Sequence, residues 1–233
     1  MHRRTSQTAL FASALACTSA TLSAQTFGPG SGGVIPDGQG DDESFTSTIL
    51  VSGVAPGLSL DRVSLSIEHL WVGDIVAILT APSGDDVHLF ARLGATPAFI
   101  LGDSSNLSLA AGPYVFRNTG ASFLGAAVAA GGTLATVPGG TFAISTTPAG
   151  YDRPLPDLDG FGVFAGDDLN GLWTLTLQDW ILPDPGMLAN WSLTIVPAPG
   201  TGILLGLAVA IGGRGDPDAQ AICRCDEFRM KET

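Results

Sequence analysis

Short stretches of alternating apolar and polar residues dominate the middle of this chain. In the segment 58–70 apolar side chains recur at every second position, with a shift of phase at Asp61. Such alternation is typical of a β-strand with one buried face, and the phase shift predicts either a β-bulge or a turn joined to the strand. The same pattern predicts further strands at 44–51, 75–80, 87–91, 114–117, 141–145, 172–179 and 189–195.

Turn-forming residues separate these strands and complete the prediction of an all-β fold. The chain has 31 Gly and 15 Pro, and many short strands between Gly/Pro-rich turns are typical of one sandwich or barrel domain. The Gly/Pro-rich segment 25–43 is expected to be a linker, and 148–158 an exposed loop. The segment 126–136 is ambiguous, and no long amphipathic helix is visible outside the two termini.

The charge balance excludes one class of partner. The net charge is −12, and between Gln25 and Gly213 the chain has seventeen Asp or Glu, four Arg and no Lys. A surface without a basic footprint is a poor match for nucleic acid. Two interpretations of the acidity stay open: solubility through charge repulsion, and binding of Ca²⁺, which takes carboxylate and carbonyl oxygen ligands.

The first 24 residues are typical of an export signal. Arg3 and Arg4 supply positive charge, a short apolar stretch follows, and small residues precede Gln25. The three cysteines (Cys17, Cys223 and Cys225) lie outside the central segment, so the predicted domain has to be stable without disulfides. We therefore expect residues 1–24 to be removed and the remainder to be exported.

Three ordered sequence blocks, Val63–Asp85, Tyr114–Gly120 and Phe164–Val196, lie within a domain expected at 44–196. Together they resemble the P/Homo B domain, the β-sandwich that follows the catalytic domain of kexin- and furin-like proprotein convertases. The departures are mild: Ala81, Asp85 and Asp167 replace serine, threonine and glutamate. The first block matches the family pattern position by position at His69, Gly73, Asp74, Leu79, Pro82 and Gly84.

This resemblance implies a jelly-roll-like, galactose-binding-like antiparallel β-sandwich of eight or nine strands. It also implies an accessory role beside a subtilisin-like protease rather than catalysis. No segment resembles the catalytic boxes of a subtilisin, and no G-x-S-x-G elbow is present. We therefore expect no enzyme activity, and we interpret His69, in phase with Val63, Leu65 and Ile67, as a buried structural histidine.

Two kinds of ligand site are candidates. Asp74, Asp167, Asp168 and Asp179 lie in predicted turns or at strand ends and are candidate Ca²⁺ ligands, although the calcium loop motif D-x-[DN]-x-[DN]-G is absent. Trp71 and Trp180 lie at strand ends, where exposed indoles can stack on sugar rings. Trp173 and Trp191 lie within alternating strands and are expected in the core.

The segment 197–214 resembles a PEP-CTERM sorting signal. It begins Pro-x-Pro, continues with a short apolar stretch and ends at Arg214, although Ala198 replaces the usual glutamate. Such a signal implies processing by an exosortase, with membrane contact only through this segment before processing. A terminal helix packed on the sandwich stays open as the alternative, and the tail 215–233 has no assigned role.

Together these observations predict an exported, surface-retained or extracellular, non-catalytic module with an interaction or structural role. Its partner is an unidentified protein or glycan of the cell envelope. Two alternatives stay open. The chain is a carbohydrate-binding module, or it is an accessory component of a subtilisin/kexin-like serine endopeptidase encoded elsewhere.

Overall fold

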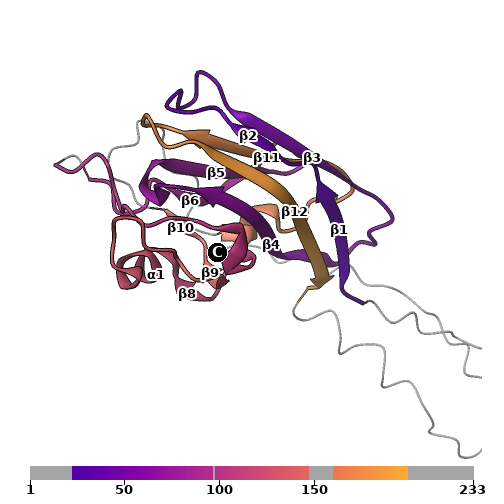
Figure 1. Cartoon of the computed structure of the whole chain (residues 1–233). Helices are drawn as coiled ribbons and strands as arrows, with labels where there is room; N and C mark the ends of the chain where they lie inside the picture. The colour runs from indigo at the N-terminus through magenta and orange to yellow at the C-terminus, as the bar shows by residue number, and fades with distance from the viewer. Residues whose placement is uncertain (1–22, 97, 147–159, 199–233) are drawn as a thin grey trace, which may run out of the picture. The chain divides into compact units, whose positions relative to one another are not determined.

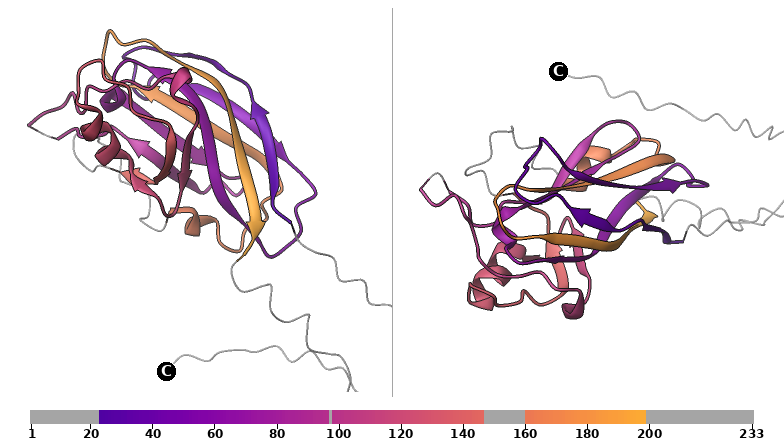
Figure 2. Two further views of the ribbon diagram at one scale, coloured as in Figure 1. Left: turned by 60° about the horizontal axis from the view of Figure 1, so that its bottom comes forward. Right: turned by 45° about the horizontal axis from the view of Figure 1, so that its top comes forward.

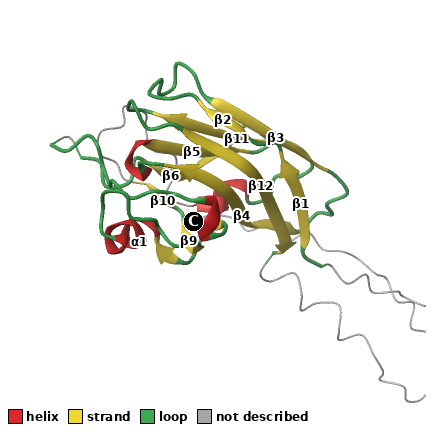
Figure 3. Cartoon of the chain, in the orientation of Figure 1, coloured by secondary structure: helices red, strands yellow, loops and turns green. Residues whose placement is uncertain are grey.

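Two sheets lie face to face and bury their apolar sides against each other (Figures 1 and 2). The structure is a computed structural model that describes residues 23–96, 98–146 and 160–198. Within these residues, strands dominate and helices are short (Figure 3). The predicted all-β sandwich is therefore confirmed.

The first sheet is built around β12 (Gly186–Pro197) and β4 (Leu58–His69), which pair along almost their whole lengths. The strand order is β1-β12-β4-β7-β9-β8, and β2 also pairs with β12. The remaining members are β1 (Gln25–Gly30), β2 (Gly33–Ile35), β7 (Tyr114–Arg117), β8 (Ala121–Ser122) and β9 (Gly140–Ala143).

The second sheet has the order β10-β6-β5-β11-β3. Its long neighbours pair antiparallel, whereas β10 with β6, and in the first sheet β9 with β7 and β8, pair parallel. The expected antiparallel sandwich thus carries parallel pairs among its short strands. The members are β3 (Phe45–Val51), β5 (Ile75–Thr80), β6 (Asp86–Ala91), β10 (Ser145–Thr146) and β11 (Gly171–Asp179).

One α-helix, α1 (Phe123–Ala130), interrupts the strands and was not predicted. The Ser122 side chain accepts a hydrogen bond from the Gly125 amide (2.9 Å), and Gly131 ends the helix at φ +103°. These are ordinary helix caps, but eight small or apolar residues give no amphipathic pattern. Three short 3₁₀ helices complete the elements: η1 (Val72–Asp74), η2 (Leu109–Ala111) and η3 (Gly160–Phe164).

The phase shift at Asp61 is a β-bulge, one of the two predicted interpretations. Leu60 pairs with Ile195 and Arg62 with Thr194, so Asp61 is an extra residue on β4 opposite β12. Leu60 and Val63 are consequently both buried although three positions separate them. The bulge keeps the apolar side of β4 on the core along its full length.

The linker prediction for 25–43 was wrong in part, because this segment contributes β1 and β2 to the edge of the first sheet. Its glycines serve close packing. A Cβ on Gly30 would lie 2.0 Å from Nε1 of Trp191, and one on Gly33 would lie 2.3 Å from the Phe45 ring. The predictions for 1–22, 148–158 and 199–233 lie outside the described residues.

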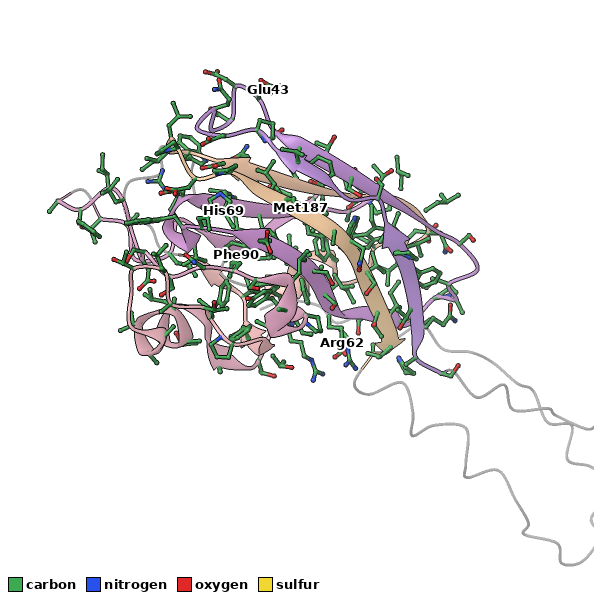
Figure 4. The ribbon with its side chains drawn as sticks, viewed as in Figure 1. Glu43, Arg62, His69, Phe90 and Met187 are labelled. Atoms are coloured by element: carbon green, nitrogen blue, oxygen red, sulfur yellow. The ribbon has the colours of Figure 1, made fainter. Side chains whose placement is uncertain are left out.

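Large aromatic side chains fill the core. Trp191 of β12 is fully buried, and its indole N–H donates to Ser47 Oγ of β3 (2.8 Å), which links the two sheets. Phe90 (labelled in Figure 4) lies in a second cluster, with ring centroids 5.2 Å from Phe116 and 5.1 Å from Phe123. This cluster joins β6, β7 and α1. Buried Trp173 and Trp191 agree with their predicted core positions.

The sandwich has two distinct ends. Gln25 pairs with Ile195, and the Ala198 amide donates to Gly57 O, so the described chain enters and leaves at the end where β11 begins with Gly171. We call this the Gly171 end. β4 and β11 finish at the opposite end, which we call the His69 end. Figure 4 shows Glu43 in the loop above this second end and Arg62 toward the Gly171 end.

Candidate functional site

His69 is the last residue of β4 and is completely buried. Its Nε2 lies 3.1 Å from Oδ2 of Asp179, whose side chain is also fully buried. An ionised carboxylate can only accept, so Nε2 donates to it. Nδ1 lies 2.9 Å from the Trp71 carbonyl oxygen and 3.1 Å from the Trp71 amide nitrogen. His69 is therefore the buried structural histidine that the sequence predicted.

Asp179 connects the end of β4 with two loops at the His69 end. Besides the bond to His69, its Oδ1 accepts from the Ile181 amide (3.3 Å), and its carbonyl accepts from the Gly40 amide (2.6 Å). The contact with Ile181 holds the loop between β11 and β12, and the contact with Gly40 holds the loop between β2 and β3. The carboxylate thus has partners for both oxygens and acts as a fixed anchor.

Asp74 and Arg92 are two further buried ionisable side chains at this end, and each affects the pKa of the other. Asp74 is 1% exposed and its Oδ1 has no hydrogen-bond partner. Arg92, 4% exposed, donates through Nε to Gly73 O (2.7 Å) and through Nη2 to Ile100 O. An arginine was not predicted here. Its sequence signal is a single cation directly after the apolar strand β6.

Burial controls the protonation of Asp74. Loss of solvent raises the pKa of its carboxyl to about 7, Arg92 opposes this rise, and Asp179, Asp184 and Asp37 add to it. Burial also lowers the pKa of the Arg92 guanidinium, while Asp74 and Asp179 oppose the decrease. Asp74 therefore changes charge near neutral pH without reaching the solvent.

The four predicted calcium ligands do not meet. Asp74 and Asp179 lie at the His69 end, whereas Asp167 and Asp168 precede Gly171 at the other end, so nine residues of β11, about 30 Å, separate the two pairs. Asp168 Oδ1 accepts from Asn170 N (3.0 Å) and Nδ2 (2.8 Å), and Asp167 accepts from Ser83 Oγ (2.9 Å). These four carboxylates therefore do not fit a single calcium ion with its six to eight oxygens.

No alternative metal cluster replaces them among the described residues, where no group of three or more His, Cys, Asp and Glu is arranged to hold an ion. Asp167 and Asp168 instead line a hollow of about 370 Å³ at the Gly171 end, together with Val54–Leu58. Calcium binding stays a prediction, and its candidate ligands lie in two pairs at opposite ends of the sandwich.

Trp71 and Trp180, the candidate sugar platform, lie at the same end and are both half-buried. The Trp71 indole donates to Leu101 O (2.8 Å). The Trp180 indole donates to Gln178 (3.3 Å), packs against Val76, Ile78 and Ala91, and lies 5.9 Å from the Arg92 guanidinium carbon. These contacts hold both indoles in place. Sugar binding by Trp71 and Trp180 stays a prediction.

The His69 end is thus a rigid, internally bonded cluster of charges under three loops. Both described histidines are buried, His69 fully and His88 with 2% exposure, so neither imidazole can approach a macromolecular substrate. The hydrogen bonds of this cluster position the loops above it.

Among the described residues, no helix has both the length and the apolarity needed to cross a bilayer.

No protein-family model matches this sequence, and no curated protein matches it. Among solved structures, the Aeromonas sobria serine protease in complex with a chaperone overlaps 76% of this chain at 14% identity, with a TM-score of 0.37. The serine protease of Aeromonas sobria alone overlaps 77% at 14% identity, with a TM-score of 0.35. The chain spans 27% and 28% of these two structures, and a likeness this low carries no argument about function.

Proposed function

We propose that this chain is an exported, non-catalytic P/Homo B-like module that acts as an accessory of a subtilisin-like serine endopeptidase. The observation that carries the proposal is the way in which the residues of the three motif blocks meet. His69 from the first block pairs with Asp179 from the third, and Gly186 from the third block lies against the His69 ring.

Other contacts also join residues of different sequence blocks. Pro82 of the first block lies against Gly171 of the third, where an added Cβ would be 2.7 Å from the proline. Tyr114 of the middle block pairs with Leu65 of the first. Residues that carry the resemblance thus form the contacts that close the sandwich at both ends and in the middle, which supports a shared architecture with P/Homo B domains.

The accessory role is tested by capturing a protease with the exported form of the full chain. Exported proteins of the native organism are labelled with a fluorophosphonate, which marks active serine hydrolases, and passed over the immobilised chain. We expect a labelled subtilisin-like enzyme, identified by mass spectrometry, and a longer thermal half-life of its activity when the chain is added. Retention of no labelled protease would overturn the proposal.

Retention at the cell surface is part of this proposal and depends on the segment 197–214, of which residues 199–214 lie outside the described part of the chain. It is checked by fractionation of cells that produce the full chain and the variant Arg214→Ala. We expect the full chain in the envelope or matrix fraction and altered sorting of the variant. Identical fractionation of the two would remove this part of the proposal.

Calcium stabilisation, also part of the proposal, is checked by thermal unfolding in calcium and in excess EDTA. A native-state site predicts a melting temperature that is several degrees higher in calcium, because binding to the folded state alone stabilises it. An unchanged melting temperature would leave solubility and charge complementarity as the interpretations of the acidic composition.

A further inference from the structure

A hollow of about 330 Å³ lies beside the bulge of β4, near the Gly171 end. Its walls come from the bulge, from the two residues that follow β7 and from η3, and β12 contributes Val196. The volume lies near the lower limit of pockets that take small ligands, about 300–1,000 Å³. We call it the Arg117 hollow, after the cationic side chain in its wall.

Part of the lining is apolar and held firmly in place. Leu60, Phe161 and Phe164 line the hollow and are at most 5% exposed. The Phe164 ring packs edge-on against the core residue Trp173, with ring centroids 5.2 Å apart. Asn118 Oδ1 accepts from the Phe161 amide (2.8 Å), which joins η3 to the residue after β7. Fixed walls of this kind lower the entropic cost of binding.

Two arginines bind one carboxylate beside the hollow. Arg62 Nε donates to Asp61 Oδ2 (2.8 Å), and Arg117 Nη2 donates to Asp61 Oδ1. The Asp61 side chain is 12% exposed, whereas the side chains of Arg62 and Arg117 are 45% and 39% exposed. The carboxylate is thus mostly covered, both arginines reach the solvent, and two cations on one anion leave an excess positive charge.

This arrangement gathers the exposed cations of the described chain in one place. Arg92, the other arginine among the described residues, is buried at the His69 end, and no Lys occurs between Gln25 and Gly213. A guanidinium has five N–H donors, and Asp61 is the only partner that the Arg117 side chain bonds within the described residues. Arg117 therefore has N–H groups left for a ligand in the hollow.

The ligand that fits these walls has an anionic group and an apolar body. A carboxylate accepts from a guanidinium through both of its oxygens, and its single charge matches the single excess charge beside the hollow. A phosphate dianion would exceed that charge. A neutral apolar ligand would remove water from Arg117 without replacing its hydrogen bonds, which costs free energy.

We propose that the Arg117 hollow binds a small carboxylate with an apolar body, such as an acylated amino acid or the C-terminal residue of a peptide. The carboxylate accepts from Arg117, and the body packs against Phe161 and Phe164. The bulge is part of the site, because the extra residue that it inserts is Asp61, the partner of Arg117; bulges often direct a side chain beside a site. The inference goes beyond the accessory role and does not depend on it.

The hollow is tested with N-acetylphenylalanine and its primary amide, which has the same shape without the charge. Each is titrated into the isotope-labelled exported form of the full chain, and NMR follows the backbone amides of Asn118, Thr119 and Gly162, which line the hollow. We expect saturable shifts with the carboxylate and at least about tenfold weaker binding of the amide, since hydrogen bonds between charged groups are the strong ones. Equal binding of the two, or no saturable shift, would overturn the inference.

The variant Arg117→Gln should bind N-acetylphenylalanine at least about tenfold more weakly. The matched control is Arg62→Gln, which makes the same charge change and loses a bond to the same carboxylate, although Arg62 does not line the hollow. It should weaken binding by less than about threefold, because solvent screens an exposed charge. Equal weakening by the two variants would contradict a direct contact with Arg117. If a variant does not fold, the two ligands on the unchanged chain still decide.

Further ligands test the two halves of the proposed chemistry. Acetate carries the charge without the body and should bind at least about tenfold more weakly than N-acetylphenylalanine, because it buries less apolar surface. Acetate of equal affinity, or phenyl phosphate of higher affinity, would overturn the assignment. N-acetyl-Gly-Gly-Phe distinguishes the sources: binding at the same amides supports a peptide C-terminus, whereas binding of N-acetylphenylalanine alone supports a free small acid.

Discussion

At the scale of single residues, the His69 end depends on buried ionisable side chains that bond to each other. His69 and Asp179 are both fully buried and bonded at 3.1 Å, so loss of one partner leaves the other in an apolar surrounding. Removal of one member of such a pair lowers the free energy of unfolding strongly, whereas replacement of both members by apolar residues changes it little. The pair therefore contributes more to the choice of one arrangement of the loops than to net stability.

The variant His69→Phe is expected to lower the free energy of unfolding by about 3–5 kcal/mol, because Asp179 loses its donor in the core. The double variant His69→Phe/Asp179→Leu should regain most of this loss, since it removes the isolated charge. Urea unfolding of the two single variants and the double variant gives the coupling energy. Additive losses would show that the two side chains are not coupled.

Asp74 gives the stability a pH dependence with a definite sign. Its pKa is about 7 in the folded chain and about 3.8 when unfolded, so between these values the folded state holds more protons. Stability is therefore greatest at the acidic side of this window and decreases as pH rises toward 7. The groups that face Asp74 are Arg92, Asp179, Asp184 and Asp37.

We expect the free energy of unfolding to decrease by about 2 kcal/mol between about pH 5 and about pH 7, and Asp74→Asn to remove most of that decrease. Urea unfolding across this range measures both. The matched control is Asp85→Asn in the exposed turn after β5, which should keep the slope of the unchanged chain. If Asp74→Asn keeps the pH dependence of the unchanged chain, another group is responsible for the decrease in the free energy of unfolding.

At the scale of elements, glycines allow strands and rings to approach closely. Gly186 begins β12 and lies against His69, where an added Cβ would be 2.2 Å from Cδ2 of the ring. Gly140 begins β9, and its Cβ would meet Phe142 at an ordinary 3.5 Å. The same substitution therefore has different consequences in two strands of one sheet.

Gly186→Ala is expected to destabilise the protein by ~2 kcal/mol or more, because the methyl group displaces the ring from Asp179. Gly140→Ala should change stability by less than ~1 kcal/mol. Thermal or urea unfolding of both variants tests the packing at the start of β12. Equal stability of the two would contradict the close contact with His69.

At the scale of the whole molecule, charge acts against compactness. The net charge of −12 is not balanced on the described surface, where the cations are arginines that are buried or paired. Repulsion among exposed carboxylates raises the free energy of the folded state, and salt screens it.

The melting temperature is therefore expected to rise by a few degrees between about 20 mM and about 300 mM NaCl, where the Debye length shortens to below about 10 Å. Neutralisation of the exposed Asp42 and Glu43 should raise the melting temperature at low salt and reduce this dependence. Differential scanning calorimetry measures both. A melting temperature that falls with salt would contradict a net repulsive surface charge.

The sequence by itself determined the features that depend on neighbouring residues. Alternation along 58–69 defined β4, and its phase shift located the bulge at Asp61, because inward and outward positions of one strand follow from backbone geometry alone. Turn residues between the strands marked most of the strand ends. Burial of Trp173, Trp191 and His69 followed from the same alternation.

Only the tertiary structure decided which residues meet across the sandwich. His69 and Asp179 are 110 positions apart, and no local pattern encodes such a pair. The sequence also assigned the glycines of 25–43 to a linker, whereas Gly30 and Gly33 serve close packing against Trp191 and Phe45. The role of Arg92, which donates to Gly73 O and Ile100 O, was equally hidden. These contacts arise from the pairing of distant strands, which is selected by burial over the whole fold and not by the preferences of any one segment.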